Sequence, residues 1–200
     1  MNHRTRRVVM SAAGILLCGI SIAFCRMADW GTDPFQTFCG GMERLTNLPF
    51  GILYLIINGM MLAGVLFLKR SLIGIATVLN MTLMGFVVEG AQGWLERYLQ
   101  PAGPAGRAVY FAAGIVVLCV GASLYFTAGL GVSVYDAAAL ILTARLKVRF
   151  EWCRIGCDLF CVAVGCILGA PVGAGTVVTA LCMGPLIEFF NIRLARPLLN

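Results

Sequence analysis

Two polar side chains stand in the middle of apolar stretches, where they are best placed to do chemistry. Asp158 lies near the centre of the stretch 151–169, and Asn58 holds the matching place in 50–68, 100 residues earlier. An ionisable group inside a lipid-embedded helix is costly, which makes it a candidate functional group. We expect both residues to contact a polar substrate, or Asp158 to carry a proton.

Arg154 precedes Asp158 by four residues, so the two side chains share one helical face and can form an ion pair. Two interpretations follow. Either Asp158 and Arg154 face the substrate, or Arg154 neutralises Asp158 as part of the fold.

Two short segments, 31–46 and 132–147, carry further polar residues near their starts. Short or broken helices leave backbone groups free to bind ions or polar solutes at membrane depth. Asp33 and Ser133 stand where N-caps stand, so we expect them to cap these helices, with a substrate contact as the alternative for Asp33. Asp136 and its counterpart Gln36 lie further in and are predicted to face a cavity.

Six residues form a second group of candidates. Glu89 and Glu188 lie near predicted helix ends, where they reach headgroup water, pair with Arg97 and Arg193, or contact the substrate. The other four lie near helix starts, where hydrogen bonding between helices explains them as well as ligand contact does. They are Thr77, Asn80, Thr176 and Thr179.

The sequence holds no familiar enzyme or metal motif. There is one histidine, His3, so a Ser-His-Asp triad is excluded, and neither a P-loop nor a Cys-x-x-Cys pair occurs. Cys153, Cys157 and Cys161 form a stripe at helical spacing, which we interpret as small residues for close packing. We therefore expect no enzyme activity, no cofactor and no metal.

The elements that must position these residues are membrane helices. Hydrophobic residues make up 60% of the chain and charged residues 12%. The runs 45–68, 108–135 and 159–187 contain no charged residue, and about 20 apolar residues cross a bilayer. This composition predicts an all-α membrane protein and excludes a soluble fold.

The net charge of +6 reports topology instead of a nucleic-acid partner, because the basic residues gather at the ends of apolar runs. The charge distribution predicts a bacterial inner (cytoplasmic) membrane protein with both termini in the cytoplasm.

The chain also resembles itself. Residues 74–89 and 173–188 share six identities in sixteen positions, and Trp30–Gln36 aligns with Leu130–Asp136. We predict one membrane domain, 1–200, a polytopic helical bundle of two tandem repeats at 7–92 and 108–191. An interfacial linker, 93–107, joins them, and 192–200 is a cytoplasmic tail.

Each repeat is predicted to contain a long helix, a short helix and two long helices. The predicted long helices are 7–25, 50–68, 72–92, 108–127, 151–169 and 173–191. The short segments either cross the membrane, giving eight crossings and parallel halves, or re-enter it, giving six crossings and inverted halves. Basic residues do not decide between the two.

Three motifs resemble the YczE/YyaS/YitT group of bacterial integral membrane proteins. They are Gly-Thr-Asp-Pro-Phe at 31–35, Gly-Val-Ser-Val-Tyr-Asp at 131–136, and Gly-x-x-Thr-Val-x-x-x-x-x-Met-Gly, which begins at 74 and again at 173. The resemblance implies a multi-pass inner-membrane protein with a duplicated core, and it brings no substrate or catalytic residue.

The sequence predicts a transporter or permease for a small polar solute, cationic or proton-coupled, with its site between the repeats. The alternative is a non-transporting membrane subunit or scaffold of a larger complex. The predicted partners are the lipid bilayer and a small-molecule or ion substrate, with a homodimer left open and nucleic acid excluded.

Overall fold

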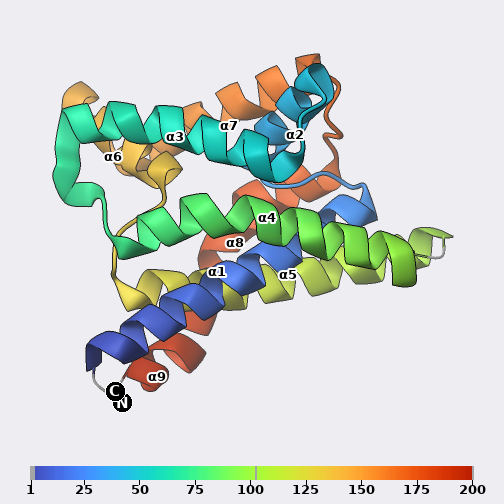
Figure 1. Cartoon of the computed structure of the whole chain (residues 1–200), viewed down its shortest axis with the longest axis horizontal. Helices are drawn as coiled ribbons and strands as arrows, with labels where there is room; N and C mark the ends of the chain where they lie inside the picture. The colour runs from blue at the N-terminus through green and yellow to red at the C-terminus, as the bar shows by residue number, and fades with distance from the viewer. Residues whose placement is uncertain (1–2, 102, 200) are drawn as a thin grey trace.

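The computed structural model describes residues 3–101 and 103–199, and all the regular structure in those ranges is helical (Figure 1). The all-α membrane class predicted from composition is confirmed. The helices are α1 (His3–Ala28), α2 (Pro34–Thr46), α3 (Phe50–Lys69), η1 (Arg70–Leu72), α4 (Ile75–Tyr98), α5 (Gly103–Ala128), α6 (Val134–Leu146), α7 (Phe150–Ile167), α8 (Ala174–Phe190), η2 (Asn191–Ala195) and α9 (Arg196–Leu199).

Four of the described helices are long and apolar enough to cross a bilayer: α1, α3 extended by η1, α4 and α5. Helices α7 and α8 are shorter, with 18 and 17 residues. At 1.5 Å per residue each is about 26 Å long, close to the ~30 Å of the hydrocarbon core.

The helices form two layers (Figure 1). The lower layer consists of α1, α4, α5 and α8, and the upper layer consists of α2, α3, α6 and α7. Within the lower layer α1 packs along α5, and within the upper layer α2 packs on α7 and α6 on α3. Each short helix therefore rests on a long helix of the other half of the chain.

Helices α1 and α5 run antiparallel and approach closely. A Cβ placed on Gly14 would lie 2.6 Å from the carbonyl oxygen of Gly121, and one on Gly114 would lie 2.7 Å from Sγ of Cys25. Small residues allow this backbone contact, as is common between membrane helices. If the two halves are repeats, α1 and α5 are equivalent helices, and their opposite directions are those expected of inverted halves.

The two short helices are alike in geometry. Each has 13 residues, and they begin 100 residues apart. Gly31 and Gly131 precede them with φ of 92° and 122°, a backbone conformation that favours glycine. Both helices end at a left-handed residue, Asn47 and Lys147. At about 20 Å, neither is long enough to cross the hydrocarbon core.

The turns before the short helices are anchored in matching ways. The amide of Gly175 donates to the carbonyl of Trp30 at 2.8 Å, and the amide of Ala76 donates to the carbonyl of Leu130 at 3.1 Å. Each turn thus binds the first turn of the last long helix of the other half. The duplication stays a prediction, and these paired contacts support it.

The linker 93–107 and the tail 192–200 stay predictions, and the structure shows the secondary structure of both. The segment 93–107 is mostly helical, because α4 continues to Tyr98 and α5 begins at Gly103. The tail is also helical, and Ala195 is buried against Met10 and Leu124. The start of α1 and helix α9 lie together at one end of the molecule (Figure 1).

Candidate functional site

A cavity of about 520 Å³ lies between the two layers, and every helix from α1 to α8 contributes to its wall. The structure brings all six of the principal predicted residues to this one cavity. They are Asp33, Gln36, Asn58, Asp136, Arg154 and Asp158.

The charged residues of the second half form a connected cluster in the cavity wall. Arg154 on α7 binds Asp136 on α6 and lies 3.3 Å from Oδ1 of Asp158, its i,i+4 neighbour. The expected Arg154–Asp158 pair is therefore present, but Asp136 shares the guanidinium. One cation serves two carboxylates.

Tyr135, which sequence reasoning did not single out as a site residue, completes this cluster. Its hydroxyl donates to Oδ1 of Asp158 at 2.7 Å. The guanidinium carbon of Arg154 lies 4.5 Å from the centre of its ring, in a cation–π contact. The tyrosine therefore contacts both charged partners of α7.

Asp136 lies in the first turn of α6, where its carboxylate opposes the positive end of the helix dipole. The hydroxyl of Ser133 donates to Oδ2 of Asp136 at 2.7 Å and accepts from the Asp136 amide at 3.1 Å. Ser133 is thus the expected N-cap of α6, and Asp136 lines the cavity.

The first half of the chain presents polar groups without a cation. Asp33 caps α2, accepting from the amide of Gln36 at 3.2 Å, and forms no ion pair with a described residue. Oε1 of Gln36, and the hydroxyl of Tyr125 on α5 of the second half, are buried without a hydrogen-bond partner among the described residues. Both residues line the cavity, so a polar ligand or water there would satisfy them.

Asn58 and Asn80 belong to a neutral network on the same wall. The amide of Asn58 donates to the backbone carbonyl of Tyr54 at 2.9 Å, and the Tyr54 hydroxyl lies 3.3 Å from Oδ1 of Asn80. Tyr54 was also missed by sequence reasoning. Its position one turn before Asn58 was the available signal.

The threonines divide between the cavity and the turns. Thr179 lines the cavity. Thr77 donates to the carbonyl of Val132 at 2.6 Å, and Thr176 lies beside Gly31. Thr77 therefore holds the turn before α6 through a hydrogen bond, whereas the side chain of Thr176 packs against the turn before α2.

The two glutamates lie outside the cavity lining. Among the described residues they do not pair with Arg97 and Arg193, and their expected contact with headgroup water stays a prediction. Oε2 of Glu89, on α4 of the lower layer, accepts from the backbone amide of Gly51 at 3.0 Å and so caps the start of α3 in the upper layer. Glu188 pairs with Arg196 at 3.1 Å, where Arg193 was predicted. The first contact joins two helices, whereas the second lies within the continuous helical stretch of α8, η2 and α9.

The chain is similar throughout to a family of unknown function (DUF6198), whose model matches residues 5–192. It is 26% identical over 177 residues to the uncharacterized membrane protein YczE of Bacillus subtilis. The aligned residues make up 88% of this chain and 80% of YczE. The uncharacterized protein YyaS of the same organism is 23% identical over 184 residues, 88% of each chain.

An uncharacterized protein of Haemophilus influenzae is 25% identical over 195 residues, 97% of this chain and 86% of its own. No solved structure matches the chain. The resemblance to the YczE and YyaS group is thereby confirmed.

Proposed function

We propose that this membrane protein, which belongs to the DUF6198 family of unknown function, is a transporter for a small organic cation. The observation that carries the proposal is the charge of the cavity. Three carboxylates and one guanidinium line it, giving a formal charge of −2 when all are ionised (−3 and +1).

Aromatic rings favour an organic ammonium group over other cations. Phe35, Tyr54, Tyr125 and Tyr135 all line the same cavity. A cation is attracted to the face of an aromatic ring, and cages of such rings with a nearby carboxylate recognise quaternary ammonium groups. Asp33, which has no cationic partner among the described residues, and Asp158 supply the counter-charge.

Helix arrangement supports a transport role. We propose six crossings, α1, α3, α4, α5, α7 and α8, with α2 and α6 re-entering the membrane from opposite sides. Phe35 and Tyr135, each the second residue of its short helix, stack with their ring centres 4.8 Å apart. Two broken helices that meet at the midplane between inverted halves are typical of secondary transporters.

The shared arginine offers a mechanism of coupling. When a substrate cation or a proton neutralises Asp158, Arg154 keeps its ion pair with Asp136 alone. The side chain then has two states, and the substrate selects between them. A movement of Arg154 toward α6 would transmit occupancy from α7 to the short helix.

A thermal-shift experiment tests the proposal. The purified protein is screened against tetramethylammonium, choline, alkylamines, alkali cations and organic acids. A ligand of the folded state raises the melting temperature by mass action, by the equivalent of ~2.7 kcal/mol at 100 times Kd. We expect ammonium ions to raise it for the parent chain and not for Asp158→Asn.

Glu188→Gln is the matched control, because it also removes a carboxylate but lies outside the cavity lining. It should respond as the parent does. An ammonium response that survives in Asp158→Asn contradicts this site. No response to any solute, together with a partner that co-purifies in fixed proportion, would favour the subunit or scaffold alternative.

A further inference from the structure

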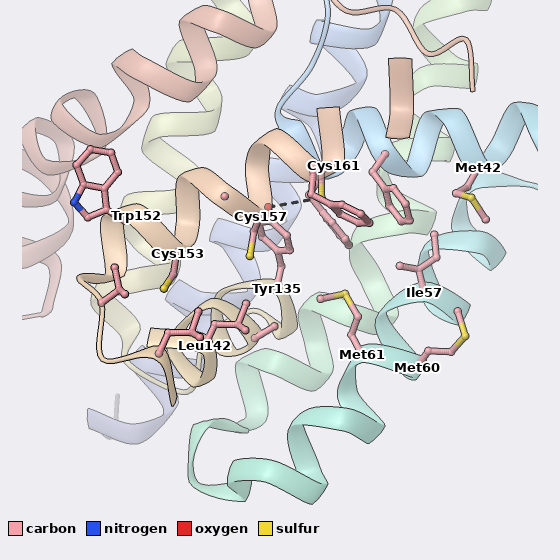
Figure 2. Close-up of a pocket in the computed structure, with 17 residues that line it drawn as sticks. Met42, Ile57, Met60, Met61, Tyr135, Leu142, Trp152, Cys153, Cys157 and Cys161 are labelled. Atoms are coloured by element: carbon pink, nitrogen blue, oxygen red, sulfur yellow. Dashed lines mark hydrogen bonds between the residues drawn. The ribbon is translucent and has the colours of Figure 1, made fainter. Parts of the chain in front are cut away.

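A second, apolar cavity lies in the upper layer, beside the charged one. This groove has a volume of about 740 Å³ (Figure 2). Its lining comes from α2, α3, α6, α7 and the α6–α7 loop, including Met42, Met61, Leu142 and Cys157. Among the described residues of this lining, Tyr135 alone has an oxygen atom in its side chain. The cysteine stripe of α7 faces the same groove.

The rim of the groove is exposed. Met60, Trp152 and Phe160 each leave about two-thirds of their surface uncovered, at 66%, 63% and 65%. In a membrane protein, exposed apolar side chains of this kind face the hydrocarbon. The groove therefore opens sideways, toward lipid tails.

A single layer of side chains separates the groove from the charged cavity. Phe35 and Tyr135 line both spaces. The Tyr135 hydroxyl lies between the two spaces: it accepts from Sγ of Cys161, a groove residue, at 3.7 Å (Figure 2), and donates to Asp158 of the charged cavity at 2.7 Å. A molecule that displaced this stacked pair would have its tail in the groove and its head at the carboxylate.

We propose that the groove holds the hydrocarbon chain of the substrate, which is a single-chain amphiphilic ammonium ion that enters from the bilayer. The ammonium head lies against Asp158 and Asp33, and the alkyl chain lies between α3 and α7. This proposal rests on the proposed function and narrows its substrate class. Charge complementarity at one end and continuity with the apolar groove at the other select this occupant.

Gly156 allows the groove to be filled without disturbing the fold. It lines the groove, and a Cβ built on it meets no atom within 4 Å. Gly156→Phe should therefore occupy the space intended for the alkyl chain. Gly59→Phe is the matched control, because Gly59 is also helical with open space at its Cβ, on α3, and does not line the groove.

The experiment measures binding of radiolabelled alkyltrimethylammonium ions, from tetramethylammonium to the dodecyl compound, in lipid nanodiscs. Each variant is compared with the parent at each chain length, so partition of the probe into lipid cancels from the ratio. We expect Gly156→Phe to leave tetramethylammonium binding unchanged and to weaken dodecyltrimethylammonium binding about tenfold. That loss corresponds to about two methylene groups of the alkyl chain that no longer fit in the groove, because each buried methylene changes affinity about fourfold. Gly59→Phe should change neither.

The outcomes separate the two proposals. Binding of every chain length that depends on Asp158 but ignores Gly156→Phe overturns the groove assignment and leaves the transported cation intact. Equal weakening of all chain lengths by Gly156→Phe also overturns it. If no ammonium ion of any length binds in an Asp158-dependent way, the proposed function fails and the groove proposal fails with it.

Discussion

The two halves of the chain share a framework and differ in charge. On α6 and α7 the cavity carries Tyr135, Asp136, Arg154 and Asp158. At the positions 100 residues earlier, α2 and α3 carry Phe35, Gln36, Tyr54 and Asn58, which are uncharged. The turns, caps and lengths of the short helices match, whereas the ionic cluster belongs to one half. The framework is therefore symmetrical, and we infer that it serves one asymmetric binding site.

A second difference concerns the ends of the cavity. Gln36 also lines a small pocket of about 170 Å³ beside α2, together with Arg26 and Glu43, which form an ion pair. The positions 100 residues later are Phe126 and Thr143, which carry no charge. Under the proposed transport function, we propose that the Arg26–Glu43 pair is a gate that closes the path between the central cavity and this small pocket.

The largest effect is expected when the second half is given the residues of the first. Asp136→Gln, Arg154→Tyr and Asp158→Asn together should abolish the ammonium response. The triple variant should still fold, because replacing a whole buried charge cluster is often neutral for stability. Ligand-dependent thermal shifts and size-exclusion profiles measure both. A retained response would show that the charge difference is irrelevant to binding.

Removing the arginine alone should be worse for stability than removing the cluster. Arg154→Ala leaves two partly buried carboxylates with no cation in their cluster. We expect a loss of about 2 kcal/mol, between the ~3–5 kcal/mol of a broken buried pair and the ~0–1 kcal/mol of an exposed one.

The matched control is Arg196→Ala, which breaks the exposed pair with Glu188 and should cost under about 1 kcal/mol. Thermal unfolding of both variants in the same detergent makes the comparison. Equal losses would mean that the cluster on α7 is an ordinary surface ion pair.

The shared framework predicts similar costs at the two glycine turns. Gly31→Ala and Gly131→Ala each place a Cβ at positive φ and against the other half, 2.9 Å from the Gly173 amide or 2.7 Å from Oγ1 of Thr77. Each should lose about 1–3 kcal/mol, and the two losses should agree within about 1 kcal/mol. If thermal or chemical unfolding shows that one of the two variants loses no stability, the two turns are not equivalent and the shared framework is contradicted.

Much of the site could be predicted because lipid penalises polarity. Asp158 and Asn58 stand in apolar helices, and burying such groups against hydrocarbon is costly, so a shared interior cavity was the natural expectation. The tyrosines were harder to predict, because a tyrosine in an apolar run fits equally well in a core or at an interface. Only the contact between Tyr135 and Asp158 reveals its role.

Contacts between helices that lie far apart in the sequence could not be predicted from the sequence alone. Glu89 accepts from the amide of Gly51, 38 residues away, and no local pattern marks that pairing. The extent of α4 was also underestimated, because the proline and glycine content of 93–107 indicated a loop. The prolines lie at 101 and 104, so the residues up to Tyr98 stay helical.

The smallest effect is expected at the gate. Glu43→Gln should weaken the pair with Arg26 and cost about 1 kcal/mol or less, because both side chains are partly exposed. When Glu43→Gln is combined with Gln36→Cys, a maleimide added from the side near α2 should label the new cysteine several-fold more than in Gln36→Cys alone. Labelling of the parent chain, which has its own cysteines, is subtracted as background. Thr143→Val, at the matching place in α6, should leave that labelling unchanged. Equal labelling of Gln36→Cys alone, with Glu43→Gln and with Thr143→Val would contradict the interpretation of the Arg26–Glu43 pair as a gate.

Counterflow in proteoliposomes is the decisive test of organic-cation transport through this cavity, because it detects exchange of solute whatever ion is coupled to it. Vesicles loaded with unlabelled tetramethylammonium are diluted into a trace of the radiolabelled ion. We expect transient accumulation of label by the parent chain and by Glu188→Gln, and none by Asp158→Asn or by empty vesicles. Accumulation by Asp158→Asn equal to the parent, or none by the parent, would contradict the proposed transport.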